Sequence, residues 1–251
     1  MVYFVGAGPG DPELLTIKGK KLIDTADVII YAGSLVNPTV LESAKEDCAI
    51  YDSSSMTLDD VIGVMKSAEA QGMTTVRLHT GDPSIYGAIR EQTDALDRLG
   101  IAHETVPGVS SFLAAAAAMS MEYTLPDVTQ TVILTRMANR TAVPEGESIR
   151  ELARHHASMV IFLSVGMIER LAAELSEEYP PSTPAAVVYK AGWRDQKICS
   201  GTLENIAERV KAAGITKTAL VVVGDFLGDN YSLSRLYDKA FTHGFRKGIS
   251  E

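Results

Sequence analysis

The sequence has few of the residues that crosslink a chain or anchor it in a membrane. Its two cysteines, Cys48 and Cys199, lie far apart without histidines at zinc spacing, so we expect two reduced core thiols rather than a disulfide or a metal site. The longest apolar run, 112–119, is far shorter than the roughly 20 residues that cross a bilayer. The chain begins Met1-Val2-Tyr3-Phe4 without a basic segment, which does not resemble a signal peptide, and we expect a cytoplasmic protein.

An excess of basic charge is also lacking. The 251 residues include 23 lysines and arginines against 32 aspartates and glutamates, a net charge of −9. Nonspecific nucleic-acid binding needs basic surface to displace counterions, and anionic lipid headgroups repel an acidic surface. We therefore predict no nucleic-acid partner and no membrane partner.

Histidines at metal-ligand spacing are missing as well. The five histidines are scattered, and the one adjacent pair would point to different sides of a helix. Metal sites need ligands at short, defined spacings, so we predict no metal ligands and assign no histidine to catalysis. The five are His79, His103, His155, His156 and His243.

The sequence does contain a regular alternation of short apolar runs and longer amphipathic stretches. The runs are mostly rich in β-branched residues, as in buried parallel strands, and the stretches repeat apolar residues at helical spacing. This pattern predicts an α/β fold with largely parallel strands. The predicted strands are 2–5, 28–31, 75–78, 131–134, 160–163, 186–189 and 220–223, and the helical spacing covers 58–65, 85–99, 167–175 and 203–210.

The alternation stops over 120–130, where Pro126 and two acids stand without a helical period. This break predicts two domains, residues 1–121 and 131–251, joined by a linker of residues 122–130. The chain after Asn230 is polar and irregular, with a candidate last helix over 233–241.

A glycine-rich loop, Gly6-Ala7-Gly8-Pro9-Gly10-Asp11-Pro12, follows the first predicted strand and precedes a helix. It differs from a dinucleotide-binding loop, because its third glycine comes one position early and two prolines remove N–H groups that would bind phosphate. The second strand also ends without a carboxylate for a ribose hydroxyl. The loop therefore suits a ligand without phosphates that approaches closely, or a tight turn without any ligand.

Two further loops join a strand to a helix. Thr80-Gly81-Asp82-Pro83-Ser84-Ile85-Tyr86-Gly87 has a glycine that permits close backbone approach, and its Asp and Ser could cap the next helix. Val106-Pro107-Gly108-Val109-Ser110-Ser111 precedes an alanine-rich helix. Ligands of open α/β sheets bind outside the carboxyl ends of the strands. Three such loops predict one binding cleft, with helix capping as the alternative role of Asp82.

In order and spacing, these three motifs resemble those of the tetrapyrrole (corrin and porphyrin) methylases, and the resemblance covers nearly the whole chain. It implies an S-adenosylmethionine-dependent methyltransferase with two α/β domains, the cofactor in the cleft between them, and a homodimer. Within the family, Tyr31-Ala32-Gly33-Ser34-Leu35-Val36 is similar to the branch that methylates carbon 11 of precorrin-4 in cobalamin biosynthesis. Thr135-Arg136, Asn139-Arg140-Thr141 and Val143-Pro144-Glu145 fit the same branch.

The resemblance also implies which residues contact the cofactor. A sulfonium cofactor carries no phosphate, which agrees with a proline-containing loop. The implied contacts are Pro9, Gly81, Asp82, Ile85, Ser110 and Ser111 in the first domain, and Leu163, Ser164 and Ala191 in the second.

The substrate would be a polycarboxylate macrocycle, which needs cationic partners, best supplied by guanidinium groups. The candidates are Arg136, Arg140, Lys190 and Arg194, each with a solvated surface charge as the alternative. Methyl transfer from sulfonium to carbon mainly requires alignment, so no acid–base pair is obligatory. Asp11 is the one catalytic candidate, which would orient a pyrrole N–H or help to move a proton, with a helix-start carboxylate as the alternative.

The predicted function is S-adenosylmethionine-dependent C-methyl transfer to carbon 11 of precorrin-4 or cobalt-precorrin-4. The sequence does not distinguish these two substrates, because the ring nitrogens of the macrocycle rather than the protein would hold cobalt. The alternatives are another tetrapyrrole methylase, such as one acting on uroporphyrinogen III, and a methyltransferase with a protein acceptor like the diphthine synthase relatives. Less favoured are a nucleotide-dependent oxidoreductase and a non-catalytic tetrapyrrole carrier.

Overall fold

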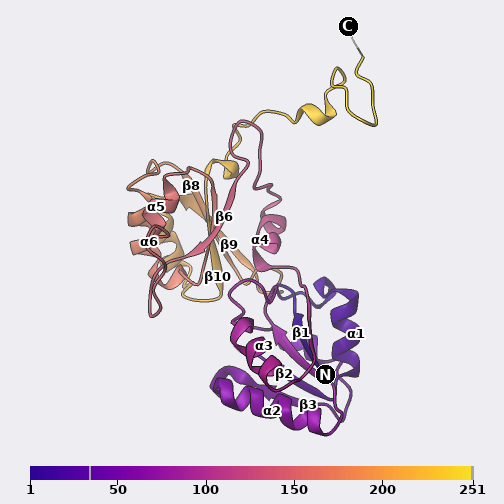
Figure 1. The fold of residues 1–251 in the computed structure, drawn as a ribbon. Coiled ribbons are helices and arrows are strands. Elements are labelled where there is room, and N and C mark those ends of the chain that lie inside the picture. Colours follow the sequence, from indigo (N-terminus) through magenta and orange to yellow (C-terminus); the bar gives the residue numbers. More distant parts are fainter. Residues whose placement is uncertain (34, 250–251) are drawn as a thin grey trace. The chain divides into compact units, whose positions relative to one another are not determined.

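The computed structural model describes residues 1–33 and 35–249, so Ser34 of the branch motif lies outside the described residues. The chain divides into two compact units, one formed by Met1–Ala118 with Lys190–Gln196 and the other by Met119–Tyr189 with Lys197–Glu251. Each unit contains one five-stranded sheet with helices packed beside it (Figure 1). The predicted α/β class is confirmed.

The first sheet is parallel throughout, in the order β3-β2-β4-β1-β5. The predicted strands 2–5, 28–31 and 75–78 are confirmed, but the edge strand β3 escaped prediction because all four of its residues are exposed and form no buried run. The strands are β1 (Val2–Gly6), β2 (Val28–Tyr31), β3 (Ala49–Asp52), β4 (Thr75–His79) and β5 (His103–Val106).

Helices cover both faces of this sheet (Figure 1). One core cluster joins α1 to Val76 and Leu78 of β4, and a second joins α2 and α3 to the opposite face. Side chains alternate along a strand, so Arg77 and His79 point to the face covered by α2 and α3. The helices of the first half are α1 (Ile17–Thr25), α2 (Leu58–Ala70), α3 (Ile89–Arg98) and α4 (Ser111–Met119).

A side-chain cap sets where α2 begins, whereas α3 has none at its N-cap position, Ala88. Thr57 caps α2 in a capping box with Asp60, in which each side chain accepts the other's backbone N–H. By contrast, α3 begins only at Ile89. Ile85, which continues the helical spacing in the sequence, therefore lies in the loop before the helix.

The second sheet corrects the expectation of largely parallel strands. Its order is β6-β7-β10-β8-β9, and only β6 and β7 are parallel. The segment between β8 and β9 is too short for a helical crossover, which needs about a dozen residues or more, so these strands pair as antiparallel neighbours. The strands are β6 (Val132–Arg136), β7 (Ser158–Phe162), β8 (Pro184–Tyr189), β9 (Lys197–Thr202) and β10 (Ala219–Val223).

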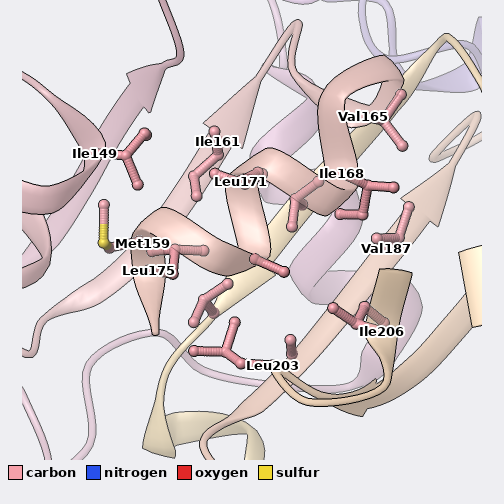
Figure 2. Close-up of a cluster of buried hydrophobic side chains, with 14 of the residues drawn as sticks. Ile149, Met159, Ile161, Val165, Ile168, Leu171, Leu175, Val187, Leu203 and Ile206 are labelled. Carbon is pink, nitrogen blue, oxygen red and sulfur yellow. The ribbon is translucent and has the colours of Figure 1, made fainter. Parts of the chain in front are cut away.

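The core of the second unit lies between this sheet and three helices, α5 (Ile149–Ala153), α6 (Ile168–Leu175) and α7 (Ile206–Ala212). Figure 2 shows Leu171 and Leu175 of α6 among side chains of β7 and β8. The candidate last helix over 233–241 is wrong, since only a 3-10 turn, Arg235–Tyr237, forms there. In the described part of the chain, no helix combines the length and apolar character needed to cross a membrane.

Candidate functional site

Three loops meet at the carboxyl edge of the first sheet, because β1 lies between β4 and β5. A Cβ added to Gly6 would lie 2.5 Å from Cα of Gly108 and 2.6 Å from the carbonyl oxygen of Gly81. Gly8 and Gly81 also exchange backbone hydrogen bonds, at 2.8 and 3.3 Å. Only glycine permits this contact of backbone on backbone, so one local packing arrangement explains one glycine from each motif, namely Gly6, Gly81 and Gly108.

Asp82 joins the second loop to the third. Its Oδ2 accepts a hydrogen bond from the N–H of Gly108 at 2.8 Å, and its Oδ1 accepts one from the N–H of Ser84 at 2.8 Å. Burial raises the pKa of this carboxyl, but hydrogen bonds from Ser84 and Gly108 outweigh burial and hold the pKa below its ordinary value. The alternative that Asp82 caps the next helix is wrong for α3, whose N-cap position is Ala88.

The second and third loops also touch through Gly81 and Ser110. Gly81 has a φ of +61°, and a Cβ there would lie 3.3 Å from Cα of Ser110. Ser110 is buried, and Ser111 begins α4 directly after it. Pro9 is buried in the neighbouring first loop. The structure thus gathers Pro9, Gly81, Asp82 and Ser110 at one edge, as the prediction of a single site requires.

Some of the described non-glycine residues with a left-handed backbone lie in or next to the candidate loops, whereas others, such as Ser120 and Thr218, lie elsewhere. Tyr86 and Ala88 of the second loop have φ values of 55° and 49°, in the left-handed region that non-glycine residues avoid. Leu163, after β7, has a φ of 54° and is 63% exposed, and Lys190, after β8, has a φ of 48°. Such strain is typical of binding and catalytic loops.

The first loop contains Asp11 and two carbonyl oxygens held by distant side chains. Oδ1 of Asp11 accepts a hydrogen bond from the N–H of Glu13 at 2.9 Å and starts a 3-10 turn, so the helix-start role is present. The carbonyl oxygens of Pro9 and Gly10 accept hydrogen bonds from Trp193 and Asn37. The sequence did not predict either bond, and the one signal for the indole was the early third glycine.

In the second unit, Ser164 connects the ends of two strands. Its buried hydroxyl donates to the carbonyl of Phe162 at 2.7 Å and accepts from the N–H of Met137 at 2.9 Å. Its neighbour Leu163 is exposed, as described above. Ala191 is buried and belongs to the segment that groups with the first unit.

The four candidate cations differ in what they already bind. The guanidinium of Arg136 donates to the carbonyls of Met137 and Thr141, both at 3.1 Å, and of Ala142 at 2.7 Å. Lys190 pairs with Asp195 at 2.7 Å. Arg140 and Arg194 are exposed. Arg140 is thus better placed than Arg136 to bind a substrate carboxylate.

Two buried basic side chains, Arg77 and His79, lie beneath the site. The sequence analysis assigned His79 no catalytic role and did not single out Arg77. His79 is 6% exposed, and among the described atoms its Nε2 has no hydrogen-bond partner. Burial, reinforced by the nearby Arg77, lowers the pKa of His79 to about 3. Arg77 donates to the carbonyl of Ile30 and to Oε1 of Gln92, both at 3.3 Å, and burial lowers its pKa to about 10. The imidazole is therefore neutral at neutral pH.

Comparison with known proteins identifies the family of the chain. A sequence profile described as Tetrapyrrole (Corrin/Porphyrin) Methylases matches residues 1–207. The chain belongs to this family. The cobalt-precorrin-4 C(11)-methyltransferase of Methanocaldococcus jannaschii is 57% identical over 248 residues, covering 98% of this chain and 96% of the relative. The precorrin-4 C(11)-methyltransferase of Pseudomonas aeruginosa is 44% identical over 248 residues, covering 98% and 99%.

Solved structures of tetrapyrrole methylases have the same fold. The X-ray structure of a cobalamin biosynthetic enzyme, cobalt precorrin-4 methyltransferase, matches with a TM-score of 0.89 at 43% identity, covering 91% of this chain and 96% of that one. A uroporphyrin-III C-methyltransferase from Thermus thermophilus, complexed with S-adenosylhomocysteine, matches with a TM-score of 0.75 at 29% identity, covering 90% and 92%. The predicted family, the methyltransferase class and the two α/β domains are confirmed.

Proposed function

We propose that this tetrapyrrole methylase transfers the methyl group of S-adenosylmethionine to carbon 11 of precorrin-4 or cobalt-precorrin-4. The observation that carries the proposal is the contact of Gly6, Gly81 and Gly108 at the carboxyl edge of a parallel sheet. This contact brings the predicted cofactor residues of three separate loops together. The choice of macrocycle is supported by the names of relatives that are 57% and 44% identical over nearly the whole chain.

The chemistry of this edge fits a sulfonium cofactor better than a nucleotide. Pro9 and Pro12 have no N–H with which to bind a phosphate. The hydrogen bonds that lower the pKa of Asp82 keep it ionised, and a fixed negative charge attracts a sulfonium and repels a pyrophosphate. When bound, S-adenosylmethionine supplies a methyl group on positively charged sulfur.

We assign the binding roles by the surface that each residue offers. Pro9, Gly81 and Ile85 would form an apolar wall that permits close approach, and the hydroxyls of Ser110 and Ser111 would bind polar groups. Leu163 and Ala191 stay proposed contacts. Ser164 would act through the backbone that its hydroxyl holds in place, because that hydroxyl already bonds Met137 and Phe162.

The macrocycle would be held by exposed cations. Arg140 would bind a substrate carboxylate, and Arg136 would shape the loop that carries Arg140 by bonding three of its carbonyls. Arg194 is a second exposed candidate, and Lys190 would contribute less because it already pairs with Asp195. Asp11 would orient a pyrrole N–H with the oxygen that does not cap the turn. Aligning the reacting atoms can supply roughly 7–11 kcal/mol of the barrier reduction. The homodimer and the cytoplasmic location stay predictions.

The test is to supply the protein with S-adenosylmethionine carrying a ¹³C-labelled methyl group. Precorrin-4, cobalt-precorrin-4 and uroporphyrinogen III are offered separately, and NMR locates the new methyl. A label at carbon 11 supports the proposal. A label at another carbon would reassign the chain to a different step of tetrapyrrole methylation, and binding of macrocycle without any transfer would favour a carrier.

A further inference from the structure

The glycine loop is held by a tryptophan from a distant part of the chain. Residues 190–196 connect β8 to β9 of the second sheet, yet they group with the first unit. Trp193, the one tryptophan of the sequence, donates from its indole Nε1 to the carbonyl oxygen of Pro9 at 3.0 Å. The two residues are 184 positions apart in sequence, so this contact comes entirely from tertiary structure.

The indole ring also explains the third glycine of the loop. A Cβ added to Gly10 would lie 2.1 Å from Cδ1 and 2.3 Å from Nε1 of Trp193. Any side chain at position 10 would therefore displace the ring. The early position of this glycine, which does not suit a dinucleotide, matches the place where the indole packs against the backbone.

A second side chain holds the next carbonyl of the same loop. Nδ2 of Asn37 donates to the carbonyl oxygen of Gly10 at 2.7 Å. Pro9 and Pro12 have no backbone N–H, so the loop has few donors of its own with which to fix its shape. The start of the loop is held by backbone bonds, from Ala7 to the carbonyl of His79 and between Gly8 and Gly81, whereas the carbonyls of Pro9 and Gly10 are bonded by the side chains of Trp193 and Asn37.

Trp193 is itself held firmly. Its backbone N–H donates to the carbonyl of Lys190 at 2.9 Å, and the N–H of Gly192 donates to Oε1 of Gln196 at 2.9 Å. The ammonium of Lys190 lies 4.8 Å from the indole centroid while it pairs with Asp195. A cation over the ring face stabilises the ring's orientation. The contacts within residues 190–196 thus fix the orientation of the Trp193 side chain.

We propose that Trp193 is a positioning residue for methyl transfer, because its indole fixes the Pro9 and Gly10 backbone against which the methyl donor binds. The inference rests on the proposed function. It deepens that proposal by assigning the placement of Pro9, and of the adjacent Asp11, to a side chain that need not touch donor or macrocycle. Asn37 acts on the same loop from the neighbouring carbonyl.

The test is the Trp193→Phe variant, which keeps an aromatic ring and removes the N–H. Loss of one ordinary hydrogen bond corresponds to about a 3- to 10-fold change in a binding constant. We expect the Kd of S-adenosylhomocysteine and the KM of S-adenosylmethionine to rise by about this factor, while the KM of the macrocycle stays unchanged. A merely structural role would lower the active fraction, and hence kcat, without moving either constant.

The matched control is Tyr51→Phe, which removes one polar group from an aromatic side chain on the edge strand β3 of the same unit. It should leave every constant at the wild-type value. Asn37→Ala should raise the same two donor constants as Trp193→Phe.

Two failures are distinguishable. A wild type that methylates the macrocycle, together with a folded Trp193→Phe protein whose donor constants are unchanged, overturns the positioning role alone. A wild type that does not bind S-adenosylhomocysteine overturns the proposed function, and the positioning role with it.

Discussion

The buried imidazole of His79 makes the stability of the protein depend on pH. The side chain lies at the carboxyl end of β4, and its ring centroid is 6.0 Å from that of Phe4. Burial lowers the pKa of His79, and no acidic side chain in the described part of the chain offsets that effect. Arg77 lies on the same face of the strand and opposes a second positive charge. Protonating His79 in the folded protein would therefore bury a charge without a counter-ion.

The size of the effect follows from two pKa values. An unfolded imidazole titrates near 6.5, whereas burial lowers the pKa of His79 to about 3 in the folded protein. Between these values the unfolded state binds a proton that the folded state does not, so the contribution is complete above pH 6.5 and is lost as pH falls toward 3. At about pH 5, about 1.5 units at roughly 1.4 kcal/mol each remove about 2 kcal/mol from the free energy of unfolding.

Carboxylates do not obscure this range. The aspartates with lowered pKa values lose their stabilising contribution only as pH falls below about 4–5, near and under their ordinary value. Measurements between about pH 7 and about pH 5 therefore isolate imidazoles. These aspartates are Asp24, Asp27, Asp52, Asp60 and Asp82.

The assay is urea unfolding of the wild type and of His79→Leu at both pH values. The readout for each protein is the change in its unfolding free energy between the two pH values. This change does not depend on how the substitution alters stability at a single pH. We expect the variant to lose about 2 kcal/mol less than the wild type. His155→Gln, which removes an exposed imidazole, is the control and should lose as much as the wild type. If His79→Leu loses as much as the wild type, the buried neutral imidazole is not the cause.

Three further predictions concern the site. Gly81→Ala places a Cβ at a φ of +61° and 3.3 Å from Cα of Ser110, which costs about 1–2 kcal/mol of backbone strain. Calorimetry should therefore show weaker S-adenosylhomocysteine binding, whereas the control Gly63→Ala, which has open space around it, should bind normally. Arg140→Ala should raise the macrocycle KM by about tenfold or more with donor affinity intact, while Arg136→Ala should also lower the melting temperature; unchanged macrocycle kinetics for Arg140→Ala would move the substrate site elsewhere. Because no three histidine, cysteine or acidic residues gather at metal-binding distance within the described ranges, methylation of a preformed substrate should survive chelation, and activity restored by added zinc or magnesium would contradict this.

The sequence by itself determined the features that depend on short-range chemistry. Buried apolar runs identified β1, β2 and β4, and apolar residues at helical spacing over 58–65 identified α2, because burial leaves local periodic patterns. The three glycine loops and their spacing identified the family. Such loops are visible in a sequence because close backbone contact admits only glycine. Each of these features can be predicted from residues that are close together in the sequence.

Tertiary structure decided the features that depend on distant partners. The mixed second sheet and the burial of His79 leave no local pattern, because strand pairing and the surroundings of a charge are set by segments far away in sequence. Gly10 shows the difference most clearly. The early position of this glycine is plain in the sequence. The reason that position 10 requires glycine is found only in the folded chain, where the indole of Trp193, 183 residues later, packs against it.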